Sequence, residues 1–395
     1  MLRKIISNNF GIFPLILSLI PMHYIMGFMD SVSNVFLVLM YAIIPCVYIV
    51  RGGISLNYSL MALLIYLPLT IVLAVPDSVF RSWERYALFL LLVLAVGPIF
   101  QSNYARDFRQ KLLNSTLVIC AILSIGSFFC FFLGINYFSM DKEGIGFRDM
   151  TGWFSGLTNQ SMILGPISGI SAIVFFYLAY IRKLKFCWIL FVSCVGSVLF
   201  AASRIAFAAT IVGLFVVLYM TNKNKKMLIK QSIVLGAILT ILFVYWGGAT
   251  DALLNKHGEV GTQNILSSRS EKITARWDEF CSSPVFGVGF NAIDPNGSDP
   301  YNKIKGTIEP GSSWMAILSM TGVIGFAIFI TVIYKMMSRL KYRKDSVIVF
   351  AILCFFFVHM CAEGYVFAAG NPAAYILWLA VGCGFDKLII KNKQI

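Results

Sequence analysis

Four basic residues are the first candidates for chemistry in this sequence. Arg269, Lys272 and Arg276 recur at helical spacing within residues 267–283, so one edge of a helix would carry all three. Guanidinium groups bind phosphate oxygens in pairs and stay charged, so such an edge suits a diphosphate. A charged face turned to solvent is the alternative. Arg204 follows a corner of small residues between two apolar segments, and it either faces a phosphate-bearing ligand or reaches a lipid phosphate.

Segment 267–283 is predicted to form an amphipathic helix. On a helical wheel the apolar side chains gather on one side, which holds Ile273, Trp277, Phe280 and Cys281. The acidic side chains are assigned to the opposite side, which holds Glu271, Asp278 and Glu279. We expect the helix to lie on the rest of the protein by its apolar face. The edge of three cations would then run along the interface between membrane and water.

Several acidic and hydroxyl side chains are candidates for proton transfer or sugar binding. Glu363 follows an apolar segment and stands beside Tyr365; it either ends a helix or partners an arginine or a sugar hydroxyl. Further polar candidates lie in the outer segments 137–159 and 248–312: Arg148, Asp294, Glu309 and Ser312. Residues 294–300 could ligate calcium but lack the complete loop pattern, which favours a plain turn. The three histidines are far apart, so we expect neither a metal site nor a cofactor.

The elements that must position these residues are apolar spans. Of the 395 residues, 58% are hydrophobic and 13% are charged, with a mean hydropathy of +0.81. Soluble domains are about one-quarter charged, so this composition excludes a soluble enzyme. We expect an all-α polytopic membrane protein with a single membrane domain over residues 1–395 and a large outer loop over 248–312. Twelve spans are expected, near residues 9–28, 33–50, 57–75, 86–101, 112–136, 160–181, 186–203, 205–221, 229–247, 313–334, 346–361 and 371–386.

The distribution of charge orients these spans. With the N-terminus inside, 21 of the 32 Lys and Arg residues but only three of the 18 Asp and Glu residues lie at the inner face. This asymmetry follows the positive-inside rule, so the net charge of +14 reports orientation and does not indicate nucleic acid. Transporters carry ionisable residues at mid-span, and these spans are almost free of them. The polar groups gather in outer segments 76–85 (with Arg81 and Arg85), 137–159 and 248–312, which favours chemistry or binding at the outer surface.

The order of several motifs resembles that of the bacterial O-antigen polymerase and O-antigen ligase superfamily, over roughly residues 145–385. Similar proteins place Ser/Thr-Arg at an outer helix corner, as Ser203–Arg204 here. They carry an arginine fifteen positions before a Pro-x-x-Gly-x-Gly turn, as Arg269 stands before Pro284. Two further segments are similar to family motifs: Gly156–Gln160 at the start of a span, and Pro310–Trp314 leading to Gly322–Gly325.

Two features favour the polymerase branch of this superfamily. Ligases of the family carry a histidine where this chain has Gly311. The C-terminal Glu363-x-Tyr365, followed by Gly370–Asn371 and Trp378, is similar to the polymerase branch. An O-antigen ligase that transfers glycan to lipid A–core stays the first alternative. A non-enzymatic flippase or other transporter of lipid-linked oligosaccharides is the second.

The resemblance implies a multi-pass glycosyltransferase of the bacterial inner membrane whose active site faces the periplasm. A glycan on undecaprenyl diphosphate would be transferred, without a metal, onto an incoming lipid-linked repeat unit. Membrane lipid and a chain-length regulator protein are further candidate partners. Arg204 and Arg269 are then assigned to the leaving diphosphate, with Lys272 and Arg276 in support. The candidate bases are, in order, Glu363, Glu309 and Asp294.

Reporter fusions test the predicted orientation. Fusions at both termini and within residues 222–227 and 336–345 should report the cytoplasmic side, because the Lys and Arg residues cluster there. A fusion at Phe280 should report the opposite side. A cytoplasmic signal at Phe280 would reverse the orientation and remove the outer site.

Overall fold

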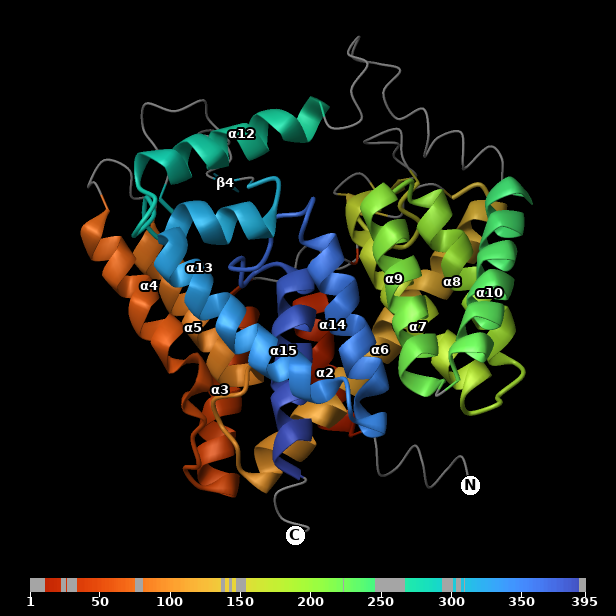
Figure 1. The fold of residues 1–395 in the computed structure, drawn as a ribbon, viewed down its shortest axis with the longest axis horizontal. Coiled ribbons are helices and arrows are strands. Elements are labelled where there is room, and N and C mark those ends of the chain that lie inside the picture. Colours follow the sequence, from red (N-terminus) through yellow and green to blue (C-terminus); the bar gives the residue numbers. More distant parts are fainter. Residues whose placement is uncertain are drawn as a thin grey trace. The chain divides into compact units, whose positions relative to one another are not determined.

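The computed structural model shows a protein built of helices (Figure 1). It describes residues 11–22, 26, 34–74, 81–135, 139–141, 144–146, 154–222, 224–245, 267–292, 301–302, 307–308 and 310–390. The strands in these ranges form two small antiparallel pairs, β1 (Ser139–Asp141) with β2 (Gly144–Gly146) and β3 (Tyr301–Asn302) with β4 (Thr307–Ile308). The predicted all-α class is therefore confirmed.

Each of the twelve expected spans coincides with a helix. These helices are α2 (Ile12–Met22), α3 (Asn34–Gly52), α4 (Met61–Leu73), α5 (Ser82–Val96), α6 (Asn103–Phe132), α7 (Ser161–Tyr180), α8 (Cys187–Phe200), α9 (Arg204–Thr221), α10 (Lys225–Tyr245), α13 (Ser313–Leu340), α14 (Val347–His359) and α15 (Pro372–Ile390). A short 3-10 turn, Tyr58–Leu60, leads into α4. Within the described residues, seven helices are long and apolar enough to cross a membrane. The chain is thus a multi-pass membrane protein.

The chain folds into two compact units that alternate along the sequence. The first comprises Met1–Leu37, Asp107–Glu259 and Leu340–His359, and the second comprises Val38–Arg106, Val260–Arg339 and Met360–Ile395. The single membrane domain expected over residues 1–395 stays a prediction.

Small residues bring the helices of the first unit close together. A Cβ atom on Gly165 of α7 would lie 2.7 Å from the Ser203 Cβ atom, and one on Gly169 would lie 2.4 Å from the Thr210 hydroxyl. A Cβ atom on Gly213 of α9 would lie 2.2 Å from the end of Ile173. Helix backbones approach this closely only where side chains are absent or small, which is how membrane helices gain packing contacts. The start of α9, with Arg204, is thereby held against α7.

In the second unit, α13 is broken at Gly322, and Figure 1 shows the helix changing direction. Gly322 has φ 62° and ψ −170°, so the helical hydrogen bonds are interrupted there. The backbone of the turn that precedes α13 takes their place. The Val288 amide donates to the Ser319 carbonyl oxygen over 2.9 Å, and the Val323 amide donates to the Pro284 carbonyl oxygen over 2.9 Å.

Two glycines make this contact possible. A Cβ atom on Gly322 would lie 2.2 Å from the Val285 carbonyl oxygen, and one on Gly287 would lie 2.4 Å from the Met320 carbonyl carbon. Both glycines also have positive φ, 62° and 78°, which side chains disfavour. The motifs at 284–289 and 322–325 therefore form one structural feature, although residues 290–321 separate them in sequence.

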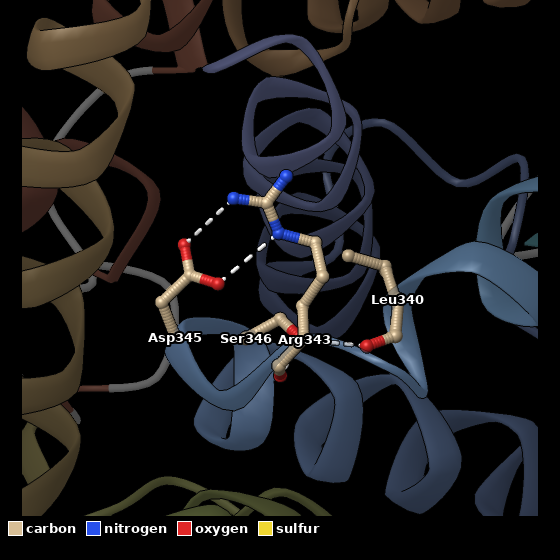
Figure 2. A network of polar contacts seen from close by, with 4 residues as sticks. All are labelled: Leu340, Arg343, Asp345 and Ser346. Atoms are coloured by element: carbon tan, nitrogen blue, oxygen red, sulfur yellow. Dashed lines mark hydrogen bonds and ion pairs between the residues drawn. The ribbon is translucent and has the colours of Figure 1, made fainter. Parts of the chain in front are cut away.

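Polar contacts fix the turn between α13 and α14 (Figure 2). The Arg343 guanidinium binds the Asp345 carboxylate through two contacts of 3.1 Å each. The Ser346 hydroxyl donates a hydrogen bond to the Leu340 carbonyl oxygen over 2.8 Å. This bond satisfies a carbonyl group at the end of α13, which has no partner within the helix. A short, basic turn of this kind fits the cytoplasmic side that the positive-inside rule predicts.

Replacing Gly322 should destabilise the second unit. Gly322→Ala forces a side chain into a backbone conformation that is essentially restricted to glycine, which costs about 1–3 kcal/mol before the clash with Val285 is counted. The purified protein in detergent should then unfold at a lower temperature. Gly236→Ala on α10 is the matched control, because nothing lies within 4 Å of its Cβ position. An unchanged unfolding temperature for Gly322→Ala would contradict this role.

Candidate functional site

Two serines at the start of α13 fix the loop between α14 and α15. The Ser313 hydroxyl donates to the Glu363 carbonyl oxygen over 2.6 Å and accepts from the Tyr365 amide over 3.0 Å. The Ser312 hydroxyl donates to the Met360 carbonyl oxygen over 3.1 Å. Both serines are buried. The candidate residues Ser312, Glu363 and Tyr365 are thus brought together, and the hydroxyl of Ser312 is engaged in holding the loop.

Tyr365 and Glu363 differ in what they can do chemically. Tyr365 is buried, and its pKa is raised well above the ordinary value, first by burial and then by the negative charge of Glu363. The phenol therefore stays protonated at neutral pH, where it can donate a hydrogen bond but cannot act as a base. Glu363 is partly exposed, so its carboxylate is the group in this loop that can accept a proton.

A cavity of about 210 Å³ lies beside this loop, entirely within the second unit. Its walls include Arg85, Leu88, Asn291, Pro310, Met320 and residues 364–370. Arg85 sits in the first turn of α5, and Asn291 is a buried residue with φ 52°. The cavity is mainly apolar, and the described wall residues with polar side chains are Arg85, Asn291 and Tyr365.

Helix α12 (Ser267–Ser282) confirms the predicted amphipathic helix but corrects the face by which it packs. Arg276 Nη1 donates to Glu279 Oε2 over 2.7 Å, and these side chains are 0% and 4% exposed. Trp277 is 50% exposed and Cys281 is exposed, whereas Ile273 and Phe280 are partly buried, so the predicted apolar face lies on the protein only in part. Residues three positions apart lie on the same face of a helix, and the ion pair allows both charged side chains to be buried. The helical-wheel prediction that Glu279 lies on the opposite side of the helix is therefore wrong.

The other basic candidates have different surroundings. Lys272 on α12 is partly buried, and Arg269 lies in the first turn of the same helix, with its side chain outside the described set. Arg204, in the first unit, is the first residue of α9 and is partly buried. It follows Ala202, whose φ of 48° marks the tight corner that the sequence predicted.

Three candidates lie outside the described residues: Arg148, Asp294 and Glu309. Arg204 is described within the first unit, and Lys272, Arg276, Ser312, Glu363 and Tyr365 within the second. The roles of all these residues in binding or catalysis stay predictions.

Sequence reasoning missed Arg85 and Asn291 as cavity residues. Arg85 belongs to an outer segment noted for its arginines, but spacing alone does not distinguish it from Arg81. Asn291 carries a weak signal, because asparagine is enriched where a residue other than glycine must take positive φ. For metals, the described part of the chain holds no group of three or more His, Cys, Asp or Glu side chains.

Residues 189–330 match the protein family described as O-antigen ligase. The matched region contains Arg204, α12 and the break in α13. It confirms the resemblance to the O-antigen polymerase and ligase superfamily. Proteins of this family are membrane glycosyltransferase-like enzymes, and the family implies lipid-linked glycan substrates. No curated protein matches the chain.

Breaking the Arg276–Glu279 pair should loosen α12. Glu279→Gln leaves a buried guanidinium charge without its carboxylate, a loss that typically costs about 3–5 kcal/mol. Amide hydrogen exchange across residues 267–282 should accelerate, and the double change Arg276→Met with Glu279→Gln should recover part of the protection.

Glu84→Gln provides the matched control for this experiment. Glu84 pairs with Arg81, but both side chains are 65% exposed, so its removal costs little. If Glu279→Gln accelerates amide exchange in α12 no more than Glu84→Gln does, the buried pair does not stabilise the helix.

Proposed function

We propose that this chain, which carries the O-antigen ligase family domain over residues 189–330, is a polymerase of O-antigen or another surface polysaccharide. It transfers a glycan from undecaprenyl diphosphate onto the non-reducing end of an incoming lipid-linked repeat unit, at the periplasmic face of the inner membrane. The observation that carries the proposal is that Arg204 and the cations of α12 all lie inside the matched region.

The chemistry requires a positive environment for the leaving group. The bond between the anomeric carbon and a diphosphate oxygen breaks, a bond to the acceptor hydroxyl oxygen forms, and the hydroxyl proton passes to a base. The leaving oxygen gains charge in the transition state, and a lost donor at such a position typically costs about 2.7–4 kcal/mol. We assign Arg204 and Arg269 to this charge, with Lys272 in support, and the proposed reaction needs no metal. The Arg276 guanidinium is buried and paired with Glu279, so it supports the site by stabilising α12.

The position of Arg204 at the start of a helix favours an anion. As the first residue of α9 it adds its charge to the positive end of the helix dipole. The free amides at a helix start and the guanidinium then both favour an anion at the same corner. A diphosphate in contact with Arg204 is stabilised by both.

Glu363 is the base we favour for the acceptor hydroxyl, ahead of Glu309 and Asp294. Its loop is fixed by Ser313, and its carboxylate is partly exposed. The neighbouring Tyr365 cannot serve as the base, because its pKa is raised well above the ordinary value by burial.

The residue at position 311 supports a polymerase over a ligase. Ligases of the family carry a histidine at this place, whereas this chain has Gly311, whose φ of 69° lies in the left-handed region that favours glycine. The ligase that transfers glycan to lipid A–core remains the alternative that shares the same family. Membrane lipid and a chain-length regulator protein are the further partners we propose.

Deleting the gene tests polymerase against ligase. A polymerase deletion should leave lipid A–core capped with at most one repeat unit, because a separate ligase still works. In a host that makes a capsule or secreted polysaccharide, high-molecular-weight glycan should disappear while single lipid-linked repeats accumulate. A silver-stained gel of lipopolysaccharide or of the lipid-linked glycans separates the outcomes. Bare core together with long carrier-linked chains would identify a ligase.

Complementation of this deletion tests the site. Arg269→Lys should fail almost as fully as Arg269→Ala, since a guanidinium binds two phosphate oxygens and an ammonium does not. Arg81→Gln serves as the control, because Arg81 lies on the surface and pairs with Glu84. If the Arg269→Lys variant makes polymer of normal length, a positive charge at this position is sufficient and the paired geometry of a guanidinium is not required.

A further inference from the structure

Helix α12 has faces with different surroundings, and Figure 1 shows it lying across one end of the second unit. Ala275, Arg276 and Glu279 are buried, so this face is covered by the protein. Glu271 and Asp278 are exposed, and their spacing of seven positions places them on one line along the helix. Exposed carboxylates strongly favour water over an apolar medium. The helix therefore has protein on one side and water on another.

The face between these two is apolar and open. Successive residues of an α-helix are rotated by about 100°, so Trp277 lies between the buried Arg276 and the exposed Asp278. Cys281 lies one turn further along the same face. Trp277 and Cys281 are exposed, and the Trp277 ring lies 5.4 Å from the ring of the partly buried Phe280. We call Trp277 and Cys281 the apolar flank of α12.

The turn that follows α12 continues this apolar surface. Val285 and Phe286 in the turn are exposed. The Ile324 amide donates to the Val285 carbonyl oxygen over 3.4 Å, and the neighbouring Val323 on α13 is exposed as well. The exposed apolar surface thus passes from the turn onto α13.

Helix α13 carries the same surface along a membrane span. The helix is long and apolar enough to cross a bilayer. Beyond Val323, the side chains of Ile330 and Tyr334 are exposed, and the three residues recur at the spacing of one helix face. In a multi-pass membrane protein, lipid chains cover such a face. The lipid-facing surface of this span therefore reaches Val323 and adjoins the turn.

A second tryptophan lies close to the same turn. Trp83, in the first turn of α5, is exposed. The neighbouring Ser82 hydroxyl donates to the Asn291 carbonyl oxygen over 3.1 Å, which ties the start of α5 to the residues that follow the turn. Tryptophan is enriched where hydrocarbon meets water, because its ring is apolar and its N–H group is polar. Exposed indoles before the turn, at Trp277, and beside its end indicate such a boundary.

We propose that α12 lies in the boundary layer of the bilayer. Its apolar flank and the exposed turn residues Val285 and Phe286 insert among the phospholipids of the leaflet next to the Val323 end of α13. The face with Arg276 rests on the protein, and the acidic face is in water. Lipid is favoured over a second copy of the chain, because the exposed surface is continuous with the lipid-facing surface of α13. This inference goes beyond the proposed function, since it requires no reaction.

The accessibility of a spin label on Cys281 tests this proposal. The full-length protein is placed in bilayer nanodiscs of phosphatidylethanolamine and phosphatidylglycerol, and the other exposed cysteines, Cys46 and Cys361, are replaced by serine. Oxygen concentrates in lipid and a nickel chelate stays in water, so the ratio of their collision rates with the label reports the medium around it. The label on Cys281 should favour oxygen, as a label introduced by Val323→Cys should.

Asp278→Cys, combined with Cys281→Ser, is the matched control. Position 278 is exposed on the acidic face of the same helix, so its label should favour the chelate. A Cys281 label that favours the chelate as strongly would place the apolar flank in water. A label that neither reagent reaches would show that protein covers the flank, and dipolar broadening between labels would identify a second copy. Each of these three results would overturn the proposal.

Quenching of tryptophan fluorescence by brominated phospholipids is a second measurement that needs no label. Trp277→Phe removes the contribution of Trp277, so the difference between the emission of the unaltered chain and of this variant isolates that indole. The difference signal should be lost when bromine lies near the headgroup and should be lost less when bromine lies at the end of the acyl chain. No loss, or a greater loss with bromine at the chain end, would exclude a position at the boundary.

Discussion

The backbone contact between the Pro284–Gly289 turn and the broken helix α13 is the constraint on which the second unit depends. A break in a helix exposes N–H and C=O groups, and such groups are costly in an apolar surrounding unless they are paired. The turn supplies the pairs, at Val288 with Ser319 and at Val323 with Pro284. Gly287 and Gly322 allow the two backbones to approach closely enough for these bonds to form.

This contact connects the elements that carry the candidate chemistry. The turn immediately follows α12, so the break ties the helix of the basic candidates to α13. The start of α13 in turn holds the loop with Glu363 and Tyr365 through Ser312 and Ser313. That loop forms a wall of the cavity. The same backbone frame thus positions a cationic helix, a carboxylate and a cavity within one unit.

Apolar length predicted the helices well, because hydropathy is a local property: the span expected at 160–181 is α7, Ser161–Tyr180. The break at Gly322 was not predictable, since the apolar pattern continues through it and its partner lies before the helix. The packing face of α12 was predicted only in part, because a helical wheel weighs apolar side chains and does not reveal that Arg276 and Glu279 are buried as a pair. Arg85 could not be singled out, because only the fold decides which outer arginine lines a cavity.

The most direct measurement uses the purified protein in lipid bilayers, with the proposed lipid-diphosphate-linked repeat unit as the sole substrate. Released undecaprenyl diphosphate and new glycosidic bonds are counted in the same reaction. Glycosyl transfer from a lipid diphosphate predicts one diphosphate released for each bond formed, without a soluble nucleotide sugar. Chain growth that requires a nucleotide sugar, or that proceeds without matched diphosphate release, would contradict it.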